Sequence, residues 1–275
     1  MKPILVHCHI FYEDLWKELS EYINNITVPF DLYVTMVQKH PMLQKQINKQ
    51  FPKAKIEIVE NLGFDVGPFI HVLKKVNLND YSYIIKLHTK RNMANNVYIN
   101  GFNVGLENWR TYLTDFLNSK EKFNKLLEQF ENNTDVGMHA NYRIIYKEKA
   151  RYSKRISDKY YDLFSKLKIK NTHFVAGTMF MVRAKLFKIV QQANISILDF
   201  EKPDHRKNTL AHYFERYFGW VITSQGYKIQ DLLNSKIKIF VSKILHKIKV
   251  FIFQKKTTSS GKTIIKIIKI PVYNK

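Results

Sequence analysis

Short apolar runs alternate with amphipathic stretches along the first third of the chain. The β-branched, apolar runs predict buried strands, at residues 3–11, 30–37, 55–61 and 83–92. Between them apolar residues recur every three or four positions, which predicts helices at residues 12–26, 42–51 and 68–76. Because parallel strands are joined through helices, this order predicts an α/β fold, a mostly parallel sheet with helices on both faces.

The later part of the chain continues this pattern less regularly. The periodicity predicts helices at residues 107–119 and 121–130, a short strand at 135–141, a polar helical excursion at 143–167, and a strand that passes into a helix at 173–190. A loop, a helix from about Asn208 and a closing strand follow. We expect one domain over residues 1–234.

From residue 235 onward the pattern changes. Apolar residues there fall on one helical stripe, at Ile237, Phe240, Val241, Ile244, Leu245, Ile248, Phe251 and Ile252. Lysines lie off this stripe, and "KTIIKIIKI" repeats the same character after a break. Residues 235–275 therefore predict a basic amphipathic segment, which either packs on the domain or lies on an anionic membrane surface. The absence of any acidic residue after Asp231 favours the membrane.

Charge and composition narrow the choice of partner. The net charge is +22, and eleven lysines in residues 235–275 supply half of it, so the surface attracts phosphate on a nucleotide, a lipid or a nucleic acid. The one cysteine, Cys8, excludes a disulfide within the chain. No apolar run is long enough to span a bilayer, and the N-terminus is no convincing signal peptide, so we expect a cytoplasmic protein.

The fourth predicted strand, "YIIKLHTKRN", ends in basic residues. In a parallel sheet, ligands bind where the strands end, so His88, Lys90 and Arg91 fall on the functional edge together with the turn "ENLGFDVGPF". Two interpretations stay open. Asp65 caps the helix at Pro68 while the two cations are solvated, or the turn and the strand end together bind a diphosphate.

Seven stretches, in order over most of residues 4–218, carry a family resemblance: "VHCHIFYEDLW", "PFDLYVT", "ENLGFDVGPF", "YIIKLHTKR", "WRTYL", "GTMFMVRAKLF" and "TLAHYFER". The chain resembles the rhamnan synthesis protein F family, bacterial surface-polysaccharide glycosyltransferases with a GT-A-like, Rossmann-type fold. In GT-A enzymes the fourth strand ends in an Asp-x-Asp motif that holds a divalent metal. Here His88 and Lys90 stand in those places. The family's turn usually reads Asn-Arg-Gly-Arg-Asp, whereas this chain has Leu62 and Phe64, which leaves the donor open.

The resemblance implies a set of donor-binding residues around this edge: His7, Asn61, Gly63, Asp65, Lys90, Arg91 and Arg110. A departing nucleoside diphosphate can be stabilised by a metal or by fixed cations. We expect Lys90 and Arg91, with His88, to do so here without a tightly bound cofactor, although Mn or Mg is possible.

On the acceptor side, the resemblance places Gly177 and Thr178 beneath the sugars. An inverting transfer also needs a base for the acceptor hydroxyl. Candidates are Asp199, Glu201, His212 and Glu215. We place Glu201 first because site residues concentrate in loops, with His88 and Glu215 as further catalytic candidates and His212 in the sugar pocket.

The predicted activity is transfer of a sugar, rhamnose first, from dTDP-rhamnose or another nucleotide sugar. The acceptor is a lipid-linked or growing surface polysaccharide, and the protein is peripheral on the inner face of the cell membrane. The alternative is a non-enzymatic lipid- or nucleic-acid-binding protein. The sequence has no helix-turn-helix, RNA-recognition or zinc signature, so we expect no nucleic-acid partner.

Overall fold

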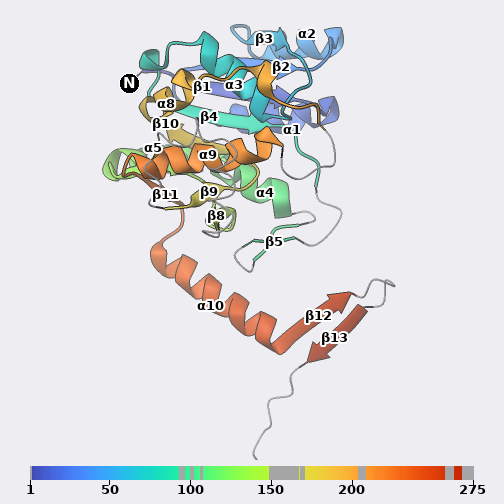
Figure 1. The fold of residues 1–275 in the computed structure, drawn as a ribbon, viewed down its shortest axis with the longest axis vertical. Coiled ribbons are helices and arrows are strands. Elements are labelled where there is room, and N and C mark those ends of the chain that lie inside the picture. Colours follow the sequence, from blue (N-terminus) through green and yellow to red (C-terminus); the bar gives the residue numbers. More distant parts are fainter. Residues whose placement is uncertain are drawn as a thin grey trace, which may run out of the picture.

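A computed structural model describes residues 2–92, 97–99, 102–105, 108–148, 167, 171–203, 209–257 and 263–267. Its centre is a seven-stranded sheet in the order β11-β7-β10-β4-β1-β2-β3 (Figure 1). The strands are β1 (Ile4–Ile10), β2 (Phe30–Met36), β3 (Lys55–Ile58), β4 (Tyr83–His88), β7 (Val136–His139), β10 (Phe180–Arg183) and β11 (Lys228–Gln230). Within this sheet only β10 is antiparallel to its neighbours, which confirms the predicted mostly parallel α/β fold.

Helices cover both faces of the sheet. They are α1 (Trp16–Ile23), α2 (Pro41–Gln50), α3 (Val66–Lys75), α4 (Asn108–Thr114), α5 (Lys120–Asn132), α8 (Lys188–Gln192) and α9 (Leu210–Ser224). A further helix, α10 (Lys236–Ile252), extends away from the sheet. The chain moves outward from β1 to β3 and then returns past β1 to β4. Because crossovers between parallel strands are right-handed, this reversal puts α3 on the face opposite α1 and α2. Helices α8 and α9 pack beside α3.

Short 3₁₀ turns connect several of these elements. They are η1 (Glu13–Leu15), η2 (Leu78–Asp80), η3 (Asp115–Leu117), η4 (Ala184–Phe187) and η5 (Ile197–Asp199). Three two-stranded sheets lie outside the main one. They pair β5 (Tyr98–Ile99) with β6 (Phe102–Asn103), β8 (Ile145–Lys147) with β9 (His173–Val175), and β12 (Phe253–Thr257) with β13 (Thr263–Ile267).

These small sheets correct three predictions. The segment predicted as a helix at 143–167 begins with strand β8, and most of its remainder lies outside the described residues. The strand predicted to open 173–190 is two strands, β9 and β10, because the chain turns at Gly177 and Thr178 and enters another sheet. The second part of the basic tail is a β-hairpin, since β13 pairs along its length with β12.

Strands β1 and β4 form the centre of the core and are buried along their whole length. Helix α3 covers one side of them with Phe69, whose ring stacks on His7 at 5.4 Å between centroids. Because both strands are buried, their sequences are nearly continuous apolar runs. Lys86, with a fully buried side chain, is the one lysine inside this run.

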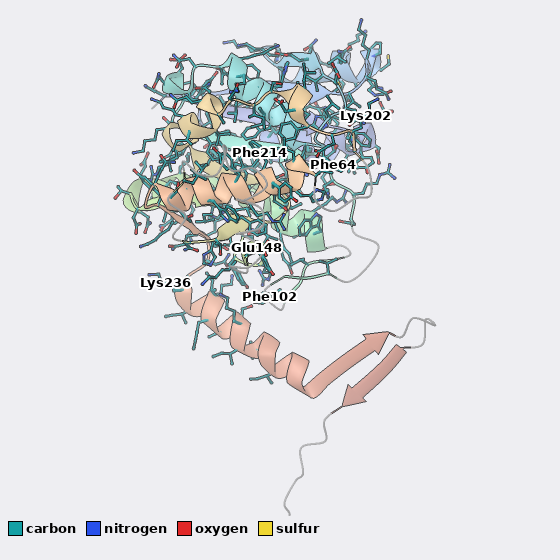
Figure 2. The ribbon with its side chains drawn as sticks, in the orientation of Figure 1. Phe64, Phe102, Glu148, Lys202, Phe214 and Lys236 are labelled. Atoms are coloured by element: carbon teal, nitrogen blue, oxygen red, sulfur yellow. The ribbon has the colours of Figure 1, made fainter. Side chains whose placement is uncertain are left out.

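Helix α10 leaves the lower edge of the sheet domain and extends away from it, beginning at the labelled Lys236 (Figures 1 and 2). Among the described side chains, its contacts with the domain come from the first two turns, where Ile239 packs against the core and the Tyr142 hydroxyl donates a 2.9 Å hydrogen bond to Ser242 Oγ. The predicted helix is therefore present, although it does not lie along the domain. Within the described residues, no helix is long and apolar enough to cross a membrane.

Candidate functional site

Two adjoining pockets open where β1 and β4 end. The larger, of about 540 Å³, is lined by His9, Phe11, Tyr12, Asn61, Phe64, Asp65, His88, Thr89, Lys90, Arg91, Asn92 and Pro203. The smaller, of about 140 Å³, is lined by Phe64, Asp65, Val66, His88, Lys90, Gly177, Thr178, Ala211, His212 and Glu215. Four residues line both pockets: Phe64, Asp65, His88 and Lys90. A ligand that fills both would therefore cross these four side chains.

Strand register brings polar side chains to the floor of the pockets. In the parallel pairs, His9 lies opposite both His88 and Thr35, while His7 lies opposite Lys86. Residues opposite one another point to the same face of a sheet. The Thr35 hydroxyl joins the two histidines of β1, at 2.9 Å from His7 Nε2 and 3.0 Å from His9 Nδ1. This hydroxyl can donate to one ring and accept from the other, so both histidines fit as neutral rings.

Beside these histidines, Lys86, Asp65 and Thr178 form a buried triangle of hydrogen bonds. Lys86 Nζ donates to a carboxylate oxygen of Asp65 and, at 3.0 Å, to the Thr178 hydroxyl. That hydroxyl in turn donates to the same Asp65 oxygen. Asp65 occupies the N-cap position of α3 but makes no side-chain capping bond, so the interpretation of Asp65 as a helix cap is wrong. Lys86 holds the carboxylate instead, because a fully buried ammonium needs a counter-charge.

The electrostatics of the floor follow from this burial. Burial opposes ionisation of Asp65, but the neighbouring His88 and Lys86, with hydrogen bonds from Lys86 and Thr178, hold the pKa of Asp65 well below its usual range. Burial also lowers the pKa of His9 to about 4 and holds the pKa of His88 well below the ordinary value. At neutral pH the floor therefore consists of one closed ion pair and uncharged imidazoles.

His88 is the most central of these rings, because it lines both pockets. Its Nδ1 lies 3.5 Å from Asp65 Oδ2, and neither ring nitrogen has a hydrogen-bond partner among the described residues. A buried polar group without a partner is costly. This arrangement therefore suits a ring that completes its hydrogen bonding with a ligand.

Strained backbone shapes the walls. Phe64 and Thr178 both have positive φ, at 56° and 53°, a conformation that is rare for side chains of these types and concentrates at functional sites. Each follows a glycine with positive φ, Gly63 and Gly177. A Cβ on Gly177 would lie 2.7 Å from the ring of Trp109, so the turn also depends on that close approach. The strain places the Thr178 hydroxyl on Asp65 and puts Phe64 between the pockets.

Lys90 and Arg91, the two cations that follow β4, differ in their contacts with other side chains. Arg91 lies 3.4 Å from Asp14, and its guanidinium stacks over the Tyr12 ring at 4.7 Å. Lys90 lines both pockets and, within the described part of the chain, makes no hydrogen bond or ion pair. It is therefore the cation that is available to an anionic ligand.

The acidic side chains predicted as catalytic candidates already accept hydrogen bonds from other parts of the fold. Glu215 accepts from the Gly177 amide at 2.7 Å through Oε1 and from Arg216 at 2.7 Å through Oε2. Glu201 accepts at 2.9 Å from the amide of Leu210, the first residue of α9. Asp199 forms a capping box with Ser196. Of these three, only Glu215 lines either pocket.

The structure brings most of the predicted site residues together. Those that line the pockets are Asn61, Asp65, His88, Lys90, Arg91, Gly177, Thr178, His212 and Glu215. Gly63 shapes the turn, and its amide donates to the Glu201 carbonyl. Two predicted donor residues do not line these two pockets: His7 is fully buried under Phe69, and Arg110 pairs with Glu18 at 3.0 Å. Arg110 nevertheless lies near the site, because it lines a small neighbouring cavity together with His88, Thr89 and Lys90.

Sequence reasoning missed Lys86 and gave no pocket role to His9 or Phe64. Lys86 carried a signal, since it is a charge inside an otherwise apolar strand and lies two residues before His88, hence on the same face. His9 could have been preferred to His7 because it is closer to the end of its strand. The position of Phe64 depends on the turn's positive φ, which the sequence does not reveal.

The donor set of the pocket floor does not suit a divalent metal. Among the described residues, no group of three or more histidine, cysteine, aspartate or glutamate side chains is placed to hold a metal ion. Of the two carboxylates that line the pockets, Asp65 faces Lys86 and Glu215 pairs with Arg216. The metal-free expectation remains a prediction, and it rests on this donor set.

Comparisons with known proteins give the wider context. The model of the family described as rhamnan synthesis protein F matches residues 1–227. Two relatives, each described as uncharacterized protein WxcX, from Xanthomonas campestris pv. campestris strains B100 and ATCC 33913, are 23% and 22% identical over 231 residues. That alignment covers 80% of this chain but only 31% of each relative. Residues 1–349 of TarS from S. aureus align at 11% identity and a TM-score of 0.43, over 85% of this chain and 58% of that one.

Proposed function

The chain belongs to the rhamnan synthesis protein F family, and on that basis we propose that it is a glycosyltransferase of surface-polysaccharide synthesis. It moves a sugar from a nucleotide-activated donor to a glycan acceptor. The chain spans about a third of the length of the curated relatives it matches, so the proposal concerns the activity of these 275 residues.

One observation carries the proposal. Lys90 projects into both pockets with no partner in the described chain, directly beyond a buried neutral His88. A nucleotide sugar has its negative charge in the middle, between the base and the sugar. A free cation between a large and a small pocket matches that pattern, because charge that develops on the leaving diphosphate is stabilised by a fixed group of opposite sign.

The remaining groups divide between the two substrates. We assign the larger pocket to the nucleoside, where Tyr12 offers a ring and Asn61 and Asn92 offer amides. His88 donates a hydrogen bond to the leaving oxygen. The smaller pocket takes the sugar and the acceptor, bounded by Gly177 and Thr178. Direct displacement between the two pockets is an inverting reaction.

The proposed donor rests on the family description, and the proposed membrane location rests on helix α10. The family description names rhamnan, so dTDP-rhamnose is the first donor to test, with UDP- and GDP-sugars as alternatives because Phe64 replaces a turn arginine of the family pattern. We propose a lipid-linked glycan as acceptor and peripheral binding to an anionic inner membrane face. The exposed apolar and basic side chains of α10 support that location.

The test is nucleoside diphosphate release by the full chain from a panel of dTDP-, UDP- and GDP-sugars, in excess EDTA and with manganese. We expect one donor to be consumed in EDTA. Lys90→Met is expected to lower kcat by about 10²–10³-fold, the effect of removing one charge-stabilising group. Arg91→Met is the matched control, since Arg91 is already held by Asp14 and Tyr12, and it should raise KM more than it lowers kcat.

Two results would contradict the proposal. Complete loss of activity in EDTA with recovery in manganese would overturn the role of Lys90 as a replacement for metal. No release from any donor, together with no thermal stabilisation by dTDP, UDP or GDP, would overturn the glycosyltransferase assignment and favour a lipid-binding protein.

A further inference from the structure

The smaller pocket contains four side chains that could accept a proton: Asp65, His88, His212 and Glu215. If the chain is the glycosyltransferase proposed above, one of them removes the acceptor's hydroxyl proton. The contacts of these four side chains show which of them is available to the acceptor hydroxyl. Asp65 is bound by Lys86 and Thr178, and each oxygen of Glu215 already accepts a hydrogen bond. His88 is assigned above to the leaving oxygen, so it is not available to the acceptor hydroxyl.

His212 differs from the other three. It is partly buried on the first turn of α9, and its ring packs edge-on against Phe64 at 5.8 Å between centroids. Phe64 lies beside the start of α9 (Figure 2). Nδ1 of His212 lies 2.7 Å from the Thr209 hydroxyl, while the described residues give Nε2 no hydrogen-bond partner. The ring is thus fixed at one nitrogen and available at the other.

The contacts at the start of α9 show why the Thr209 hydroxyl is bonded to His212 and not to the helix amides. Thr209 occupies the N-cap position, where a threonine hydroxyl usually accepts a bond from the helix amides. Here the hydroxyl makes no capping bond and contacts His212 instead. The Glu201 carboxylate takes over one cap by accepting from the Leu210 amide. Glu201, the first candidate from sequence, therefore supports the helix end, and Thr209 is free to orient the imidazole.

We propose that His212 is the general base of the transfer and that Thr209 is its positioning residue. Thr209 Oγ1 accepts from Nδ1–H, which leaves the lone pair of Nε2 in the pocket. The acceptor oxygen bonds to the anomeric carbon of the donor sugar as the bond from that carbon to the diphosphate oxygen breaks. The electron pair leaves with the nucleoside diphosphate, and the hydroxyl proton passes to Nε2.

The surroundings of His212 suit this role. Burial is the main cause that lowers its pKa, Glu215 and Asp65 oppose the shift, and Arg216 and Lys90 add to it. The ring is therefore uncharged at neutral pH and able to accept a proton. Protonation of a base stops the reaction, and the pKa of His212 is lowered, so the acidic limb of the activity profile should have its midpoint below about 6.5, the ordinary pKa of histidine.

The experiment uses the full chain, the donor that releases most nucleoside diphosphate, and octyl rhamnoside or water as acceptor. We expect His212→Gln to lower the release rate by about 10²–10⁴-fold and to leave the dissociation constant of the nucleoside diphosphate unchanged. Thr209→Val should lower the rate less and move the acidic limb of the pH profile. His40→Gln, a histidine that lines neither pocket, is the matched control and should preserve both rate and profile.

Several results would overturn the role of His212 as the general base. A His212→Gln rate within threefold of the unsubstituted chain, or an acidic limb that persists in this variant, would overturn the proposal. So would a loss of nucleotide affinity as large as the loss of rate. Abolition of transfer by Glu201→Gln in a folded protein would return the role to Glu201. Failure of the proposed function is distinct, because the unsubstituted chain would then release no nucleoside diphosphate.

Discussion

The ends of β1 and β4 and the helix α10 are both rich in basic side chains, but they use them in opposite ways. At the strand ends His7, His9, Lys86 and His88 are almost completely buried. On α10 the lysines whose side chains are described, Lys236, Lys238 and Lys243, are exposed. Six apolar side chains on this helix are exposed as well, at Ile237, Phe240, Val241, Ile244, Leu245 and Ile248.

The difference separates two kinds of electrostatics. Buried groups respond to pH, because folding changes their protonation, and they are little screened by salt. Exposed groups on α10 respond to salt and change little between pH 5 and 8, since lysine stays charged there. The net charge of +22 therefore says little about the site, where the histidines are neutral and Lys86 is paired with Asp65, and it describes mainly the exposed lysines.

Acid should destabilise the strand-end region strongly. His7, His9 and His88 are neutral when folded because burial lowers the pKa of each, whereas an unfolded histidine binds a proton below about pH 6.5. The unfolded state then binds more protons, so the free energy of unfolding falls as the pH drops. Each histidine contributes about 1.4 kcal/mol per pH unit, or roughly 4 kcal/mol per unit for three. Urea unfolding at pH 7, 6 and 5 measures this.

A single substitution provides the control for that slope. His9→Gln removes one titrating ring and keeps a polar group near Thr35, so the slope between pH 6 and 5 should fall by about 1.4 kcal/mol per pH unit. An unchanged slope in this variant would show that His9 is protonated in the folded protein. A flat profile in the unsubstituted chain would contradict the account for all three rings.

Removal of the counter-charge should have the next largest effect. Asp65→Asn leaves Lys86 buried without a partner charge, and we expect it to lower the free energy of unfolding by about 3–5 kcal/mol. The exposed pair Asp135–Lys228 is the matched control, and Asp135→Asn should produce no measurable change. Chemical unfolding at pH 7 compares the two. Because folding depresses the pKa of Asp65, the contribution is present at neutral pH and is lost only below about pH 4.

A combined variant sharpens this result. Asp65→Asn with Lys86→Met removes both charges and should recover much of the lost stability, since an apolar replacement of a buried pair is often neutral. If the double variant is no more stable than Asp65→Asn alone, the loss came from the hydrogen bond to Thr178 and not from the unpaired charge.

Much of the fold could be predicted because it depends on local patterns. The strand–helix alternation of residues 4–76 reports burial directly, and Pro41 and Pro68 begin or lie in the first turn of their helices. The failures come from non-local pairing. "HFVAGTMF" divides into β9 and β10 because a turn at Gly177 and Thr178 sends each half to a different partner strand. "TIIKI" is a strand because "FQKKT" lies opposite it.

The site shows the same limit at the level of single side chains. Placement at a strand end was predictable for His88 and Lys90, since topology fixes where strands end. The choice between capping and ion pairing for Asp65 was not, because its partner Lys86 is 21 residues away and comes near only in the folded sheet. For the same reason Glu201 looked like a free loop carboxylate until α9 supplied the amide that it binds.

The smallest predicted effect concerns α10 and tests the other half of the comparison. We expect the full chain to bind vesicles of phosphatidylcholine with phosphatidylserine more tightly than vesicles of phosphatidylcholine alone, and salt to weaken binding. Replacement of Lys236, Lys238 and Lys243 by Gln should cost about 1 kcal/mol per lysine, roughly fivefold in affinity for each. Lys120→Gln with Lys125→Gln on α5, where the lysines are exposed but lie outside the amphipathic segment, is the matched control. An equal loss per lysine in both sets would mean that net charge alone drives binding. Loss confined to α10, and also seen in Phe240→Ser with Leu245→Ser at unchanged charge, would identify its apolar and basic face as the contact.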